Sequence, residues 1–424
     1  MSVEPVIPGR EGPGEPSSSS VPRHPYWILA AVCLLALMST VGAAMPYPIL
    51  APIFLQGPVD AFTHFAGIPP SVLMGAALAA NPLGILIGSL YAGPLSDRHG
   101  RRVVLGVTLV ATLAGHLVTA AALAARQYPL FVVARFATGL TESNVAVARA
   151  LVADLPGSID RTAAFAWLNA FLFAGWLVGP LLGGATFVYG ESVPFVAAAV
   201  MMVPCLAILA LGLPAPPPRA PGAVPPVGVL ALVRSDRALA AVCALQLAYT
   251  LGINAFYEFE PLWMLQQAGL GSRGIAVVVA LQCGVMTLSS LVAGRVGSAP
   301  GHPLRRAALA ALAAASGLAL LGVLPGHAGL AAIVALGVPT ALYNAVLPAW
   351  MSERFAAHGQ GRVMGLLSTI FCVANVAVAL AGGWIALLST RWIMGLGGLA
   401  CIGASFLMLR YARREAARPA ARHS

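Results

Sequence analysis

Charged residues within long apolar runs are the side chains of this sequence best suited to chemistry. Arg135, Glu142 and Arg149 follow one another at intervals of seven residues, a step that returns to nearly the same face of an α-helix with a drift of about 20°. Arg135 and Glu142 lie about 10 Å apart along such a helix, too far to pair directly. Because an apolar helix holds charges only where they face a cavity or a partner, these two either exchange protons or tie helices together. Arg149 is interpreted as an anchor at the helix end.

A second polar stripe occurs in a later apolar run, where four polar residues recur at intervals of four and so share one helix face. These residues are Gln246, Thr250, Asn254 and Glu258. Glu260 points about 200° away from Glu258 on an unbroken helix, so only one of the two acids lines a given cavity. The spacing nominates Glu258, for which a functional role and a place at a hydrated rim stay equally open. Pro261 suggests that the helix bends or ends nearby, which would leave Glu260 hydrated.

Aromatic and amide side chains supply candidate walls for a cavity that takes an amphipathic ligand. The candidates are Tyr47, Gln246, Tyr249, Asn254, Tyr257, Tyr343 and Asn344, with Trp263 and Trp350 as further aromatic residues. The alternative for each aromatic residue is packing, or a place in the aromatic belt at a membrane interface.

Several familiar chemistries are absent from the sequence. The nucleotide-binding loop G-x-x-x-x-G-K-[ST] requires a lysine, and this chain contains none, so ATP is excluded as the direct energy source. The eight histidines show no metal-ligand spacing. The six cysteines are isolated within apolar runs, where small buried hydrophobic residues are expected. We therefore expect no cofactor, no metal and no enzymatic activity.

The elements that must position these residues follow from the composition. Hydrophobic residues make up 59% of the chain and charged residues 9%, against about 45–50% and 25% in soluble domains. The 24 basic residues are all arginines, and their scatter between apolar runs of about 20 residues is typical of helices that cross a bilayer. The expected partner of the basic surface is a lipid bilayer and not nucleic acid. Total lysine avoidance suggests a GC-rich bacterial genome, and hence the bacterial inner membrane.

Twelve windows long enough to span a bilayer can be placed on the chain. They cover about residues 27–52, 71–92, 103–124, 129–151, 162–187, 192–213, 238–264, 273–296, 306–325, 328–350, 363–388 and 391–411. With the N-terminus inside, the cytoplasmic segments hold 19 of the 24 arginines, the outer loops hold three, and two lie in the fourth span. This asymmetry predicts that both termini are cytoplasmic.

The chain is predicted to divide into two halves of six spans. Residues 214–236 carry repeated prolines and no apolar period, which predicts a semi-rigid cytoplasmic linker between an N-terminal half, 27–213, and a C-terminal half, 237–411. Residues 1–26 are expected to be disordered, and 412–424 to form a basic cytoplasmic tail. Gly183-Gly184 recurs as Gly382-Gly383, a weak repeat of the kind expected for a duplicated six-helix unit with substrate between its halves.

The segment between the second and third spans reads GPLSDRHGRR, residues 93–102. Its glycines and proline, at positions 93, 94 and 100, are expected to make a tight turn, and its arginines to lie at the headgroups. The segment resembles the signature loop of the major facilitator superfamily, G-x-L-[AS]-D-[RK]-x-G-[RK]-[RK], with every fixed position filled. The resemblance implies a conformational latch formed by Gly93, Asp97, Arg98, Gly100, Arg101 and Arg102. Asp97 would meet the start of the eleventh helix near Gly361 and Arg362, with Arg101 as its local partner.

Two further segments resemble motifs of the same superfamily. Arg135 and Gly139 match the fourth-helix motif R-x-x-q-G, whose arginine is associated with proton transfer in antiporters, although Thr138 replaces its glutamine and Glu142 replaces a small residue. Residues 175–184 match the motif g-x-x-x-G-P-x-x-G-G of the antiporter branch at every fixed position, namely Gly175, Gly179, Pro180, Gly183 and Gly184. The implied packing partner is the eighth span, with Gly284 and Gly294 as candidates.

The resemblance covers about residues 27–411 and implies an all-α membrane protein with twelve transmembrane helices in two six-helix halves. It implies alternating access and proton-coupled efflux of small amphipathic molecules or drugs, with Arg135, Glu142 and Glu258 as proton-coupling residues. The first span lacks the acid common in such exporters, which transfers that role to Glu142 or Glu258. The alternatives are a dedicated exporter of one metabolite such as a sugar or siderophore, a proton-coupled importer, and a membrane receptor without flux. We expect a monomer.

Overall fold

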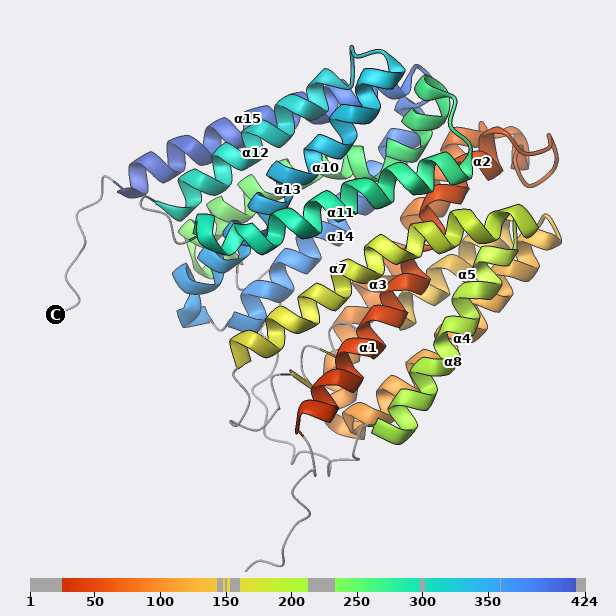
Figure 1. The fold of residues 1–424 in the computed structure, drawn as a ribbon, viewed down its shortest axis with the longest axis horizontal. Helices are drawn as coiled ribbons and strands as arrows, with labels where there is room; N and C mark the ends of the chain where they lie inside the picture. Colours follow the sequence, from red (N-terminus) through yellow and green to blue (C-terminus); the bar gives the residue numbers. More distant parts are fainter. Residues whose placement is uncertain are drawn as a thin grey trace, which may run out of the picture.

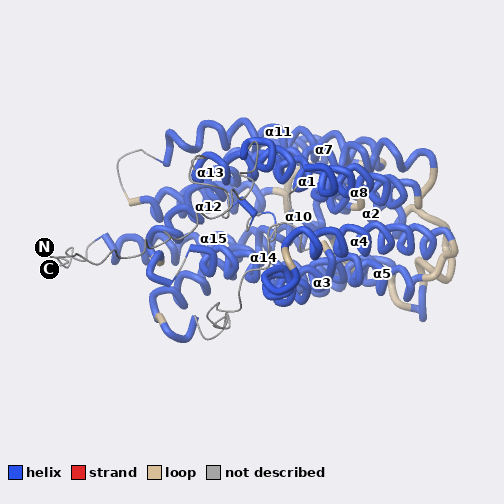
Figure 2. The backbone as a smooth tube through the Cα atoms, turned by 90° about the horizontal axis from the view of Figure 1, so that it is seen from below, coloured by secondary structure: helices blue, strands red, loops and turns tan. Residues whose placement is uncertain are grey.

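A computed structural model describes residues 25–142, 148, 151–152, 161–212, 233–297, 302–358 and 360–416. Throughout these ranges the chain forms long helices joined by short turns, with no strand (Figure 1). The long helices run side by side as one bundle (Figure 2). The length and apolar character of the runs therefore predict the class of fold correctly.

The helices of the first half follow the expected spans closely. They are α1 (Pro25–Ala44), α2 (Tyr47–Leu55), α3 (Pro70–His99), α4 (Arg101–Ala124), α5 (Tyr128–Thr141), α7 (Arg161–Thr186) and α8 (Val193–Gly212). The first span is divided into α1 and α2 at Met45 and Pro46, because proline has no N–H to donate within a helix.

The second half repeats this pattern. Its helices are α10 (Arg237–Ala268), α11 (Ser272–Gly297), α12 (Pro303–Leu320), α13 (Gly326–Arg354), α14 (Gln360–Ile385) and α15 (Thr390–Ala416). Eleven helices of the described residues are long and apolar enough to cross a membrane, with α1 and α2 counted as one. The fourth expected span is α5, which ends at Thr141, and most of its remainder lies outside the described residues.

The expected turn between the second and third spans is largely helix. α3 continues through Gly93 and Pro94 to His99, and α4 begins directly at Arg101. The reversal falls on Gly100, whose φ of 87° lies in the region that glycine adopts without strain. The prediction of a tight turn at Gly93 and Pro94 is wrong, because α3 continues through both residues for about two further turns.

The helices pack as two groups that meet along two seams. In the first group α1 packs on α7 and α8, and α5 on α3 and α4; in the second, α15 packs on α10 and α12, and α13 on α11 and α12. Between the groups, α3 packs on α14 and α7 packs on α11. This grouping agrees with the division into two halves, whereas the exact domain boundaries stay a prediction.

The repeated glycine pairs lie at these two seams in equivalent ways. A Cβ added to Gly183 would lie 2.1 Å from the carbonyl oxygen of Met45, and one added to Gly382 would lie 2.2 Å from the ring of Phe259. The first glycine of each pair therefore packs on the first membrane-spanning segment of its own group. Each second glycine faces the opposite group. Gly184 approaches Ser272 and Ala276 of α11, and Gly383 approaches Ser71 and Val72 of α3. The weak sequence repeat therefore has a structural counterpart in paired close approaches.

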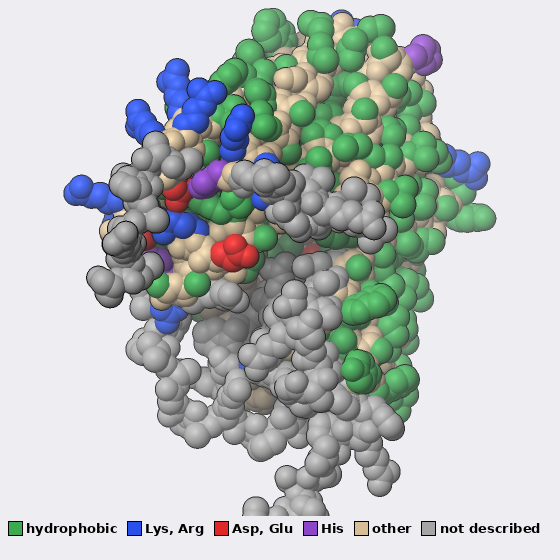
Figure 3. Space-filling model, turned by 60° about the vertical axis from the view of Figure 1, so that its left-hand side comes forward, with side chains coloured by type: hydrophobic (Ala, Val, Ile, Leu, Met, Phe, Trp, Pro, Cys, Tyr) green, Lys and Arg blue, Asp and Glu red, His purple; other side chains and the backbone are tan. Residues whose placement is uncertain are grey.

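Most arginines of the described residues lie at one end of the bundle. Figure 3 shows basic side chains clustered on one face of the described surface, beside flanks that are mostly hydrophobic. α4 begins with Arg101 and Arg102, and α15 carries Arg413 and Arg414 in its last turn. We call this the arginine-rich end and the opposite one the Asp60 end, after a residue of the α2–α3 loop. By the count of arginines we expect the arginine-rich end to be cytoplasmic.

Candidate functional site

Glu142 is buried between three helices of the first group. It caps the C-terminus of α5 and is 7% exposed. Asn81 of α3 donates from Nδ2 to Oε2 at 2.7 Å, and Nε2 of His116 on α4 lies 3.2 Å from Oε1. The close approach that allows this is made at Gly139, where a Cβ would lie 2.1 Å from the carbonyl oxygen of Asn81. The glycine of the fourth-helix motif thus brings Asn81 to Glu142.

Arg135 lies two turns before Glu142 on α5 and is 4% exposed. Its Nε has no hydrogen-bond partner among the described residues. Its charge acts over a distance on Glu142 in its own group and on Tyr47 and Glu258 at the boundary between the groups. The prediction that Arg135 and Glu142 do not pair directly agrees with this geometry, in which a single cation is shared between two carboxyl groups.

Glu258 joins the two groups of helices. It lies on α10, is 3% exposed, and its Oε1 accepts hydrogen bonds from Tyr47 Oη of α2 at 3.1 Å and from Asn375 Nδ2 of α14 at 2.6 Å. Tyr47 also packs edge-to-face on Trp176 of α7, with 5.2 Å between ring centroids. The burial of Glu258 rules out the hydrated-rim alternative in this arrangement. Of its two hydrogen-bond donors, Tyr47 belongs to the opposite group of helices.

Glu260 is also buried, at 3% exposed. α10 continues through Pro261 to Ala268, so the suggestion that Glu260 is hydrated near a helix end is wrong. Gln282 of α11 faces its carboxyl group. Glu258 and Glu260 point to different sides of the helix, as the spacing predicts.

The predicted cavity residues of the second group form two clusters. The hydroxyl of Tyr343 donates to Oε1 of Gln246, and the rings of Tyr343 and Tyr249 lie 4.1 Å apart. Asn254 is buried and donates to the carbonyl of Phe371 at 3.3 Å. In the second cluster, Tyr257 lies within reach of Thr340 and Asn344, and Asn344 is exposed. Tyr47 lies apart from both, with Glu258.

The predicted latch lies partly outside the described side chains. The side chains of Gly93, Asp97 and Arg98 are not among them, so the contact of Asp97 with Arg101, Gly361 or Arg362 stays a prediction. Arg362 is exposed. Arg102 donates from Nη2 to the carbonyl of Ala210 at 2.8 Å, so it binds the last turn of α8, where a cation is favoured.

The glycines of the fifth-span motif pack mainly on α1. A Cβ added to Gly175 would lie 2.6 Å from Thr40, one added to Gly179 would lie 2.6 Å from Ala44, and Gly183 meets Met45. Pro180 lies inside α7. Gly184 alone of these four glycines meets α11. The implied packing on the eighth span is therefore wrong for the other three.

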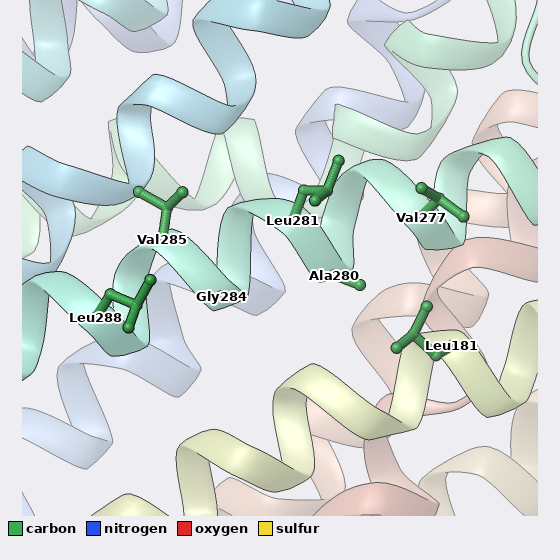
Figure 4. A pocket seen from close by; sticks show the side chains of 7 residues that line it. All are labelled: Leu181, Val277, Ala280, Leu281, Gly284, Val285 and Leu288. Carbon is green, nitrogen blue, oxygen red and sulfur yellow. The ribbon is translucent and has the colours of Figure 1, made fainter.

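The expected partner glycine Gly284 on α11 is not at this contact. No atom lies within 4 Å of a Cβ added to Gly284, and Gly294 lies outside the described side chains. From Gly184 towards the N-terminus of α7, the helices α7 and α11 diverge around an apolar groove of about 410 Å³ (Figure 4). The groove is lined by Leu181, Val277, Ala280, Leu281, Gly284, Val285 and Leu288. Gly284 thus borders a gap and not a packed interface.

Three site residues are not predicted from the sequence: Asn81, His116 and Asn375. Asn81 and Asn375 are isolated polar residues within apolar runs, whereas His116 follows Thr108 and Thr112 at intervals of four and so shares a helix face with them. A systematic search for polar residues in predicted spans would find all three. Among the described residues no group of three His, Cys, Asp or Glu side chains could hold a metal ion.

The sequence model of the Major Facilitator Superfamily matches residues 27–379. The chain belongs to this superfamily of membrane transporters. The fold agrees with two solved structures. That of the human organic anion transporter MFSD10 has a TM-score of 0.69 at 21% identity and covers 91% of this chain and 99% of its own. That of a D-xylose-proton symporter has a TM-score of 0.71 at 16% identity, covering 91% and 98%.

Curated relatives match shorter stretches. The class B tetracycline resistance protein of Escherichia coli is 27% identical over 172 residues, 40% of each chain. The class G tetracycline resistance protein of Vibrio anguillarum is 36% identical over 129 residues, 30% of this chain and 32% of its own. A major facilitator superfamily multidrug transporter of Candida albicans is 28% identical over 192 residues, 44% of this chain and 29% of its own. The matches span two fifths or less of these relatives.

Proposed function

We propose that the chain exports small amphipathic molecules in exchange for protons by alternating access. The observation that carries this proposal is the buried contact between Tyr47 of one group and Glu258 of the other. A carboxyl group at a boundary that opens and closes changes its surroundings in every cycle. Export rather than uptake is supported by the antiporter-type motif in α7 and by relatives named as tetracycline resistance and multidrug proteins.

Glu258 is the proposed site of the coupled proton. With the groups in contact it accepts hydrogen bonds from Tyr47 and Asn375 and feels the charge of Arg135. Separation at the Asp60 end would remove Tyr47 and admit water, whereas Asn375 would stay with its own group. The carboxyl group then exchanges a proton with that side, which we expect to be the outside, and carries it inward when the groups close.

Glu142 has a different role in this proposal. Its partners Asn81 and His116 and the nearby charge of Arg135 all belong to its own group, so they move together when the groups rock. Its surroundings change little during the cycle. We assign to Glu142 the stabilisation of the buried charge of Arg135 over a distance, and that charge in turn stabilises the ionised form of Glu258.

The test compares Glu258→Gln with Glu142→Gln in proteoliposomes loaded with fluorescent dyes. We expect Glu258→Gln to sustain a smaller dye gradient per pH unit than the wild type while it keeps dye exchange without a gradient, because the amide mimics a protonated acid. Glu142→Gln should slow efflux without uncoupling it. Full proton-driven efflux by Glu258→Gln would contradict the assignment. Uptake that collapses with a protonophore would indicate an importer, and no flux of any dye or labelled metabolite would indicate a receptor.

Tyr47→Phe tests the contact between the groups directly. The variant keeps the ring contact with Trp176 but lacks the hydroxyl that donates to Glu258. A hydrogen bond to a charged group contributes about 1.5–3 kcal/mol, so coupled efflux should slow by about 10- to 150-fold if this bond holds the closed state. Efflux at the wild-type rate would show that the bond is incidental.

A further inference from the structure

Glu260 is a buried acid that the proposed exchange at Glu258 leaves without a role. Among the described residues its hydrogen-bond partner is the amide of Gln282 on α11. With the amide oriented by its hydrogen bonding, Nε2 donates to Oε1 at 3.1 Å and to Oε2 at 3.2 Å. One amide group therefore holds both carboxyl oxygens.

Glu260 has no basic partner among the described residues. The titratable side chains that interact with it are Tyr257 on its own helix and Cys283 on α11, both of which are ordinarily neutral at pH 7. Glu142 and Glu258, in contrast, both interact electrostatically with the charge of Arg135. A buried carboxylate without a cation costs several kcal/mol. Binding of a proton would neutralise Glu260 and remove this cost.

Helix α2 of the first group packs on both helices that hold this site. α10 packs mainly on α14 and α15, and α11 packs mainly on α13 and α7, so the Glu260–Gln282 contact bridges two helices that touch little elsewhere. α2, which belongs to the first group, packs on both α10 and α11. Separation of the groups at the Asp60 end would move α2 away from both helices.

Polar side chains lead from Glu260 towards the other end. Tyr257 lies one turn earlier on α10 and within reach of Thr340 and Asn344 on α13. Glu260 is about 12 Å from the Ala268 end of α10, whereas the exposed Asn344 is about 27 Å from the Gly326 end of α13. These two helix ends lie together, because Gly326 approaches Gln267 and Ala268. The path thus runs towards the arginine-rich end.

We propose that Glu260, held by Gln282, is a second proton-binding site of the transport cycle. Its carboxylate takes a proton from water at the Asp60 end when α2 moves away. With α2 closed, the O–H bond breaks, the proton passes to water at the exposed Asn344, and Glu260 returns to the carboxylate. The cycle therefore moves one proton more than Glu258 alone would carry. This inference rests on the proposed function, because it adds a proton to the same exchange.

The experiment measures the dye gradient that an imposed pH gradient sustains, with purified protein in proteoliposomes, ethidium as the dye and the membrane potential clamped. Each coupled proton supplies about 1.4 kcal/mol per pH unit. The wild type should sustain an ethidium gradient of about 100-fold per pH unit, and Glu260→Gln one of about 10-fold. Glu353→Gln, which removes an exposed acid of α13, should match the wild type. An unchanged gradient in Glu260→Gln would overturn the proposal.

A second measurement keeps the inference separate from the proposed function. Infrared titration of the purified protein detects protonated carboxyl groups without any substrate. We expect two buried carboxyl groups that gain and lose a proton with pH in the wild type; Glu258→Gln should lose one of them, and Glu260→Gln should lose the other, which is the carboxyl of Glu260. If Glu260→Gln removes no titrating carboxyl, the second site is wrong even where coupled efflux is intact. If the carboxyl titrates but no ethidium gradient forms at all, the proposed function fails and not the proton site.

Discussion

The seam between α3 and α14 allows a sharp test of alternating access at Gly75. A Cβ added to Gly75 would lie 2.3 Å from the carbonyl oxygen of Ala379 and 3.2 Å from Cα of Gly383, where ordinary contacts begin at 3.4 Å. Both obstacles are backbone, so they cannot turn aside as a side chain does. Gly75→Ala therefore requires the two groups to separate by about 1 Å at this seam.

The free energy of this clash sets the size of the effect. Overpacking by one methyl group in a well-packed interface costs about 1–3 kcal/mol, and the cost falls only on the arrangement in which the groups touch at the Asp60 end. The equilibrium between the closed and open arrangements should therefore shift towards the open one by about 5- to 150-fold.

The assay is thiol labelling from the Asp60 side of the membrane. Ser71 is buried near this seam, so Ser71→Cys, in a background without the six native cysteines, reports opening through its reaction with a membrane-impermeant maleimide. Gly75→Ala should raise the labelling rate by at most the 5- to 150-fold shift of the equilibrium between the closed and open arrangements. Gly284→Ala is the matched control, because it adds the same methyl group to a helical glycine with nothing within 4 Å.

Two outcomes would refute the reasoning. Unchanged labelling in Gly75→Ala would mean that the close approach to Ala379 does not hold the seam closed. An equal increase in Gly284→Ala would mean that the effect arises from any added methyl group and not from the seam. Loss of folded protein is distinguished by comparing the thermal unfolding of both variants.

Two further predictions concern the loops. The hydrogen bond from His358, together with the backbone N–H groups of the α10 N-terminus, holds the pKa of Asp236 below its usual 3.8. Its contribution to stability is therefore present above about pH 4 and is lost as the pH falls through the lowered pKa. Asp236→Ala should cost about 1 kcal/mol near pH 7 through the lost helix cap, and the difference in unfolding temperature should shrink below about pH 4; a constant difference would contradict this. Arg126 pairs with Asp60 at 3.0 Å and with Glu191 at 2.8 Å although its φ is 52°, so Arg126→Ala should destabilise by about 1 kcal/mol at low salt and less at high salt. Arg126→Gly should lose less, because glycine adopts this φ freely, and equal losses would show that backbone strain is unimportant here.

The expected spans agree with the helices because each span is a local property. A run of about 20 apolar residues forms a helix in a bilayer whatever it packs against, so most helix ends fall within a few residues of the expected bounds. The miss at the end of α3 arises because Gly93 and Pro94 are turn signals in water. In this chain the helix continues past both of them to Gly100.

The candidate site was predictable only where side chains follow a helical period. Glu142 and Glu258 belong to such stripes, and both are buried at polar contacts. Asn81, His116 and Asn375 come from other helices, and their distance from the two acids depends on how those helices cross. The same limit explains the partners of the α7 glycines. Spacing shows that a helix is closely packed, but not which helix packs on it.

The sequence by itself therefore determined the membrane class, the order and length of the spans, the distribution of arginines and the family. These depend on composition and on short motifs read along one chain. Only the tertiary structure decided that Glu142 meets Asn81 and His116, that Glu258 is held from both groups, and that Glu260 is buried against Gln282. The physical reason is that a buried charge is compensated by whatever lies beside it in space, and those neighbours come from helices far apart in the sequence.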